Sequence, residues 1–98
     1  MAMEKLSVRD GPQVFATLPA SVGQLFFPAG TRLPLEGVSV HAQDEVSFIL
    51  SGRLRAFSGD GEYTLVAGDT TLIPAGEEHW AEVLEDVTLC YVLLERST

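Results

Sequence analysis

The feature that most constrains this chain is the repeated interruption of short apolar runs by turn-forming residues. No stretch keeps apolar residues at the i, i+3, i+4, i+7 spacing of an amphipathic helix. Short extended runs with turn signals about every 8–12 residues are typical of β-sandwiches and barrels. The pattern predicts an all-β fold of about nine or ten strands. The clearest of these expected strands lie at residues 13–18, 22–27, 38–41, 46–50, 54–57, 62–66, 70–73, 79–83 and 87–94.

The length of the chain limits it to a single domain. Its 98 residues match the usual size of one domain with one modest core. Asp60 and Gly61 tolerate positive φ and predict a hairpin turn between two of the strands. Residues 1–10 carry four charged side chains and no apolar segment like that of a secretory signal, so we expect an N-terminal arm and a cytoplasmic protein.

The charge of the chain excludes some classes of partner. The formal net charge is −8, and the six Lys and Arg residues are scattered. Binding to nucleic acid or to an anionic membrane requires clustered positive charge, so we expect neither partner. No apolar run approaches the roughly 20 residues that span a bilayer. The single cysteine, Cys90, cannot form an internal disulfide, and its apolar neighbours predict a buried, unreactive side chain.

Two histidines and one glutamate are the residues best suited to chemistry. Alternation along strands places Glu45 on one face with Ser47, and His79 on one face with Ala81. If these faces and that of His41 point into one barrel, two imidazoles and a carboxylate converge. Such a set suits Fe(II) with open positions for substrate or oxygen, and also Mn, Zn or Ni. The alternative is that the histidines are ordinary polar residues of a hydrated barrel mouth and Glu45 is merely paired.

Two stretches have a more specific spacing than the three residues alone. The first, from His41 to Gly52, reads His, three residues, Glu, six residues, Gly. The second, from Gly68 to His79, reads Gly, five residues, Pro, one residue, Gly, two residues, His. These stretches resemble the two signature motifs of the cupin family. The short segment between them, residues 53–67, is similar to that of small bacterial cupins.

The resemblance implies both a fold and a site. Cupins form a double-stranded β-helix, or jelly-roll, barrel, so residues 1–98 are expected to be one cupin domain whose barrel core is residues 28–94. In cupins the motif histidines and the glutamate bind a divalent metal, and these roles fall on His41, Glu45 and His79. Cupins often dimerise through sheet edges, so a homodimer is expected.

Three positions depart from the pattern of the family. Ser39 stands where the first motif usually has another His, Leu33 where it usually opens with Gly, and Val83 where the second motif usually ends with Asn. The expected site therefore has three protein ligands, and the choice of metal is more open. Ser39, Ser47 and Ala81 are small, so we expect them to line a substrate pocket beside the metal.

Other candidate residues have a structural interpretation first. Trp80 alternates away from His79, which favours a core or dimer contact over substrate stacking. Glu78 belongs to an acidic loop, with a role as substitute ligand as the alternative. Arg53 and Arg55 indicate an exposed strand face, with anchoring of a carboxylate substrate as the alternative.

Three functions remain open from the sequence. The first is a metal-dependent enzyme on a small polar metabolite, for which the resemblance allows dioxygenase, isomerase, epimerase, lyase or cyclase chemistry. The second is a non-catalytic metabolite-binding or sensing cupin without metal. The third is a domain that only binds a partner or forms oligomers, with residues 87–94 pairing across a dimer. No residue stands out as a general base, so the catalytic residues are unknown.

Overall fold

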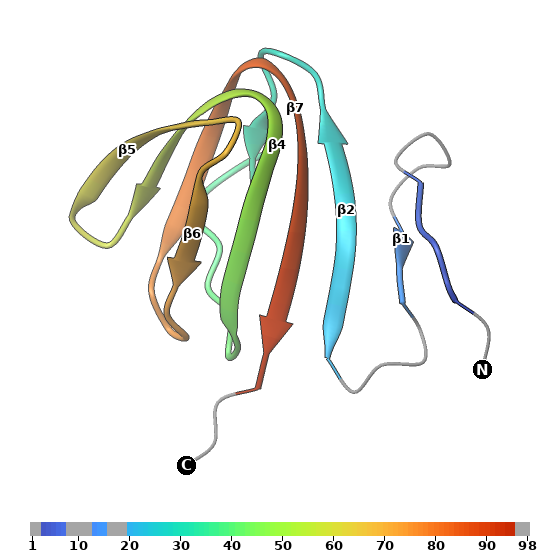
Figure 1. The fold of residues 1–98 in the computed structure, drawn as a ribbon. Helices are drawn as coiled ribbons and strands as arrows, with labels where there is room; N and C mark the ends of the chain where they lie inside the picture. Colours follow the sequence, from blue (N-terminus) through green and yellow to red (C-terminus); the bar gives the residue numbers. More distant parts are fainter. Residues whose placement is uncertain (1–2, 8–12, 16–19, 96–98) are drawn as a thin grey trace.

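The computed structural model describes residues 3–7, 13–15 and 20–95 and confirms the all-β prediction. One seven-stranded antiparallel sheet folds over on itself (Figure 1). Its strands are β1 (Gln13–Val14), β2 (Ser21–Phe27), β3 (Arg32–Leu33), β4 (Asp44–Ser58), β5 (Gly61–Val66), β6 (Thr70–Ile73) and β7 (His79–Leu94). Within the described residues, no helix has the length and apolarity needed to cross a membrane.

Two long strands, β4 and β7, bend into arches and pair with each other along their length (Figure 1). The first half of β4 lies between β6 and the second half of β7. The second half of β4 lies between β5 and the first half of β7. β2 extends one half of the barrel and β3 the other. The bends close one end of the barrel, and the strand ends surround the opposite end, which we call the mouth.

The number of strands differs from the prediction for a physical reason. The expected strands 46–50 and 54–57 are one strand, β4, and 79–83 and 87–94 are one strand, β7. Irregular pairing between Ile49 and Leu54 bends β4 without ending it. Gly52 sits in this bend with φ +86°, and a Cβ there would lie 2.0 Å from the carbonyl oxygen of Asp86. Gly52 thus permits the close crossing of the two arches.

Two other expected strands also differ. Residues 38–41 form only an isolated bridge, in which the N–H of Ser39 donates to the carbonyl of His79 and the N–H of His79 donates to that of Ser39. This segment follows a turn at Gly37 and has no second neighbouring strand to extend its pairing. The expected strand 13–18 begins at Gln13 as β1, but residues 16–18 lie outside the described residues, as does part of the expected arm 1–10.

The hydrophobic core lies at the closed end of the barrel. Its buried members are Ile49, Leu54, Val83, Val87 and Leu89. They come from both halves of each arch, so the bends of β4 and β7 hold the core on two sides. Burying such side chains stabilises the fold by about 1.5–3 kcal/mol each. The core therefore fixes the bend and leaves the interior nearer the mouth open.

Candidate metal centre and the cavity behind it

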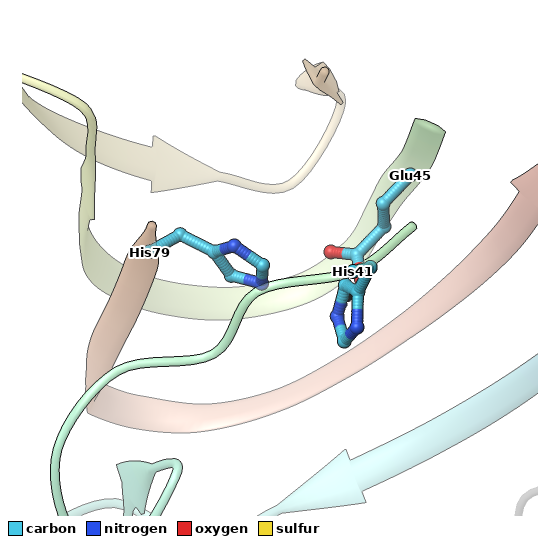
Figure 2. Close-up of side chains that lie close together, drawn as sticks. All are labelled: His41, Glu45 and His79. Carbon is cyan, nitrogen blue, oxygen red and sulfur yellow. Dashed lines mark ion pairs between the residues drawn. The ribbon is translucent and has the colours of Figure 1, made fainter. Parts of the chain in front are cut away.

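The side chains of His41, Glu45 and His79 meet at the mouth of the barrel, pointing toward one another (Figure 2). One ligand atom from each residue can be chosen so that all three lie within 4.8 Å of one another. Nε2 of His41 is 3.2 Å from Oε1 of Glu45, and the two imidazole rings have centroids 4.9 Å apart. The sequence prediction that strand alternation brings these three groups together agrees with this geometry.

Backbone hydrogen bonds between the two motif segments hold this geometry. The N–H of Gly76 donates to the carbonyl of His41 at 2.8 Å. The N–H of Ala75 donates to Oδ1 of Asp44, also at 2.8 Å. The turn that precedes β7 is therefore fastened to the loop that precedes β4. This explains why the spacing of Pro and Gly before His79 matters: the turn positions His79 against His41, in the loop, and Glu45, at the start of β4.

The hydrogen bond of His79 fixes which of its nitrogens is available. Nδ1 of His79 lies 3.1 Å from the carbonyl oxygen of Glu77. A carbonyl oxygen only accepts, so Nδ1 carries the proton and Nε2 presents its lone pair. A backbone carbonyl that orients the second nitrogen is the usual support of a histidine that binds metal.

The donor set fits a divalent transition metal. Metal–nitrogen and metal–oxygen bonds of about 2.0–2.2 Å place neighbouring ligand atoms roughly 3 Å apart. The 3.2 Å separation of the His41 and Glu45 atoms matches that value, and His79 needs only a small shift. Two neutral imidazoles and one carboxylate suit Fe, Mn, Zn or Ni better than Ca or Mg, which prefer oxygen ligands.

A cavity of about 690 Å³ lies behind the three side chains. Register places its wall residues in layers below the ligands. Ser47 lies opposite Tyr91 and Thr71, and Ala81 lies opposite Ala56. A deeper layer contains Leu65 and the core residues Ile49, Leu54 and Leu89.

The three residues expected to form a substrate pocket, Ser39, Ser47 and Ala81, all border this cavity. Ser47 is nearly buried and lies directly below Glu45 on the same face of β4. The sequence interpretation missed Tyr91 and Ala56, which border the same cavity. Alternation from Leu89 and from Leu54 would have placed both side chains inside, but a tyrosine and an alanine carry no motif signal.

The other candidate residues lie outside the cluster of His41, Glu45 and His79, which we call the ligand cluster. Trp80 stacks on Phe57 with a centroid distance of 4.0 Å, and the guanidinium of Arg32 covers its ring, although both aromatic residues also border the cavity. Glu78 is exposed and does not belong to the cluster. Arg53 pairs with Glu85, and Arg55 with Glu62 and Glu82. Neither arginine borders the cavity. Arg53 is exposed as predicted, whereas Arg55 is half-buried.

Of the three positions that depart from the family pattern, Ser39 borders the cavity, and the structure also places the other two. Leu33, in β3, pairs with Ala81 and borders the cavity. Val83 is 2% exposed and belongs to the core, four residues after His79 on β7.

The prediction that Cys90 is buried is wrong. Cys90 is half-buried, because it lies on the outer face of β7, opposite Phe48 and Gln24.

Comparison with known proteins decides the family. The family model described as Cupin domain matches residues 24–94, which include both motifs and most of the barrel. The chain belongs to the cupin family. No curated protein is significantly similar in sequence to this cupin. The predicted cupin fold is thus confirmed, while the function has to be argued from the site.

Solved structures agree with this assignment. A cupin protein of Bacteroides fragilis is 23% identical, aligns over 97% of this chain and 86% of its own, and gives a TM-score of 0.80. A cupin-2 domain containing protein of Shewanella frigidimarina is 25% identical over 84% of this chain and 78% of its own, with a TM-score of 0.67. A cupin superfamily protein of Desulfitobacterium hafniense is 17% identical over 87% and 76%, with a TM-score of 0.76.

Proposed function

We propose that this cupin binds one divalent transition metal through His41, Glu45 and His79 and acts as an enzyme on a small molecule bound in the cavity. The observation that carries the proposal is the convergence of the three ligand atoms, within 4.8 Å of one another, at the entrance of a 690 Å³ cavity. A bound metal would supply Lewis-acid chemistry, or oxygen binding if it is iron.

The residues around the cluster support this proposal. The side chain of Glu45 is 21% exposed and that of His41 is 33% exposed, so a metal between them would be reachable from the cavity and from solvent. Burying a carboxylate between two imidazoles is costly unless a cation compensates its charge. The net charge of −8 favours the approach of a cation over that of an anion.

A non-catalytic binding cupin is the second candidate. The observation that favours it is the state of the other acids at the cavity, Asp69 and Glu77. Asp69 accepts a hydrogen bond from the N–H of Val66, and Glu77 accepts one from the hydroxyl of Ser58. Both carboxylates therefore have structural partners, and neither stands out as a general base. In this case the cavity would bind its ligand without converting it.

Elemental analysis of protein purified without chelator tests metal binding. We expect close to one equivalent of a transition metal in the wild type and less than a tenth of that in His79→Ala. Glu78→Ala is the matched control, because Glu78 is the exposed neighbour of His79, and it should retain the metal. Equal and negligible metal in all three proteins, after loading with Zn, Mn, Fe or Ni, would reject the proposal and leave the metal-free binding cupin.

We also propose that the chain forms a homodimer through the outer face of β2, β7, β4 and β6. Two rows of paired residues cross this face without any charge: Val22, Val92, Val46 and Leu72, and Gln24, Cys90, Phe48 and Thr70. Phe48 is 41% exposed and Leu72 63% exposed. Depletion of charge is typical of the centre of an interface. On an acidic chain this neutral face is where a second copy meets the least repulsion.

Light scattering on the purified protein tests this arrangement. We expect a dimer at micromolar concentration in the wild type and a monomer in Phe48→Lys. Val38→Lys introduces the same charge at another exposed apolar residue, outside the outer face, and should remain a dimer. A monomeric wild type, or a dimeric Phe48→Lys, would contradict the proposed interface.

A further inference from the structure

The chemical character of the cavity changes with depth. At the mouth it carries His41, Glu45, His79 and the carboxylate of Glu77, beside the aliphatic Ile73 and Leu93 that lie opposite Glu45. One register step inward, hydroxyl-bearing and methyl side chains form most of the wall. Deeper still, the wall is mostly apolar. A ligand that enters this cavity meets these three environments in order.

The middle layer is built from small side chains. Ser47 is two residues after Glu45 on the same face of β4, and Ala81 is two residues after His79 on the same face of β7. Ala56 lies opposite Ala81 across the strand pair. These small residues leave a passage between the ligand cluster and the interior. Two tyrosines border the cavity at this level, Tyr91 opposite Ser47 and Tyr63 opposite Ala56.

The deep layer is lined mainly by apolar residues. Leu25, Phe27, Leu65 and Leu89 border the cavity beside the core residues Ile49 and Leu54. Asp69, whose backbone pairs with Ile49, also borders it at this level, and its carboxylate accepts from the N–H of Val66. A carboxylate or phosphate group placed there would lose its hydration without a cationic partner, at large cost. An alkyl or aryl group placed there gains by burial, about fourfold in affinity for each CH₂.

The charges around the cavity also favour a ligand whose inner part carries no anionic group. Among the described residues that border it, none is Lys or Arg, and the charged side chains other than the histidines are Glu45, Asp69 and Glu77. A second anionic group on a ligand would therefore find no protein cation to pair with. Since the described lining residues offer an anionic ligand no Lys or Arg, its head group would pair with the metal of the proposed function.

We infer that the ligand of this cupin is a small molecule with one metal-chelating head group and an uncharged, apolar body that extends past Ala81 toward Leu65. This inference rests on the proposed function for its head group. It replaces the expectation of a generally polar metabolite with a narrower class: phosphorylated compounds, polyols and dicarboxylates are disfavoured. Chelating acids or enols that carry an alkyl or aryl substituent are favoured.

Three hydroxamic acids test the inference on zinc-loaded protein. Acetohydroxamic and hexanohydroxamic acid share the chelating head and differ in alkyl length. Adipic acid monohydroxamate has the chain of hexanohydroxamic acid with a carboxylate in place of the terminal methyl. By calorimetry, we expect hexanohydroxamic acid to bind at least tenfold more tightly than either of the other two. Equal affinities of the short and long acids, or tighter binding of the adipic compound, would overturn the inference.

A variant locates the apolar body. Ala81→Leu fills the passage below the ligand cluster without changing a ligand, so it should retain zinc but lose the tenfold advantage of the long chain. Leu50→Ala changes an aliphatic residue that is 52% exposed and does not border the cavity, and it should keep that advantage. An unchanged chain-length preference in Ala81→Leu would contradict the proposed position.

A metal-free arm separates this inference from the proposed function. Hexan-1-ol added to chelator-treated protein should shift the methyl resonances of Ala81 and Leu65 and leave those of Leu50, which does not border the cavity, unchanged. If the protein takes up no zinc but hexan-1-ol gives these shifts, the metal proposal fails and the apolar interior stands as a ligand site. If zinc binds but neither chain length nor hexan-1-ol has an effect, the inference fails and the metal site stands.

Discussion

The closed end and the mouth of the barrel are built from the same two strands but use their residues differently. At the closed end, β4 and β7 contribute Ile49, Leu54 and Val87, which are 3%, 5% and 0% exposed. At the mouth, the same strands contribute Glu45 and His79, which are only half-buried. The comparison teaches that an inward-facing residue is fully buried near the bend of an arch and only partly buried near its ends. The hydrophobic core is therefore concentrated at the bend, and the polar side chains at the mouth remain accessible.

The sharpest test of this difference compares two glycines. Gly52 at the bend and Gly76 at the mouth have φ of +86° and +83°, so alanine would suffer similar backbone strain at both. A Cβ at Gly52 would lie 2.0 Å from the carbonyl oxygen of Asp86, whereas one at Gly76 has nothing within 4 Å. We expect Gly76→Ala to cost about 1–2 kcal/mol, from strain alone. Gly52→Ala should cost at least about 2 kcal/mol more, from overpacking.

Urea unfolding of the two variants measures this difference. A Gly52→Ala protein as stable as Gly76→Ala would show that the arches are not closely packed where they cross. The proposed difference between the bend and the mouth would then be wrong.

Two valines provide the next test. Val87→Ala removes two methyl groups from a completely buried side chain, and we expect a loss of about 2–3 kcal/mol in the free energy of unfolding. Val40→Ala makes the same deletion beside His41, where the side chain is 53% exposed, and should cost less than about 0.5 kcal/mol. Similar losses in thermal or urea unfolding would mean that stability is spread evenly over the barrel.

Substitution of His79, one of the three residues proposed to bind the metal, tests the mouth alone. His79→Gln should change the stability of metal-free protein by less than about 1 kcal/mol, because the ring is half-buried and outside the core. With free zinc at about 100 times its dissociation constant, the wild type should gain about 2.7 kcal/mol, and His79→Gln should gain almost nothing. Equal stabilisation of both proteins by zinc would place the metal elsewhere.

The smallest expected effect concerns the rim. The hydroxyl of Ser58 donates to the side-chain carboxylate of Glu77. The backbone carbonyl of Glu77 accepts from Nδ1 of His79. Ser58→Ala should cost about 1 kcal/mol of stability and weaken zinc binding less than tenfold, because it acts on His79 only through Glu77. A loss of zinc binding as complete as that of His79→Gln would mean that Ser58 is itself close to the metal.

The fold and the convergence of His41, Glu45 and His79 could be predicted from the sequence because both depend on short-range patterns. Alternation placed Glu45 with Ser47 and His79 with Ala81, and the spacing of the motifs joined the two segments. The long strands could not be predicted. The residues around Gly52 look like a turn, and only the crossing of β4 over β7 shows that the chain bends there and continues its pairing.

The depth of the cavity could not be predicted either. Which layer Tyr91 or Leu65 occupies depends on the register between strands far apart in sequence, such as β4 with β7 and with β5. A shift of one residue would turn each of these side chains to the opposite face. Composition and motif spacing do not fix that register. The apolar interior from which the body of the ligand is inferred could therefore be recognised only in the structure.

The most direct test of the central claim is anomalous scattering from crystals grown with zinc, collected on both sides of the zinc absorption edge. The account predicts one strong peak at about 2.0–2.2 Å from a nitrogen of His41, an oxygen of Glu45 and Nε2 of His79. Absence of a peak there, or a peak held by other side chains, would contradict it.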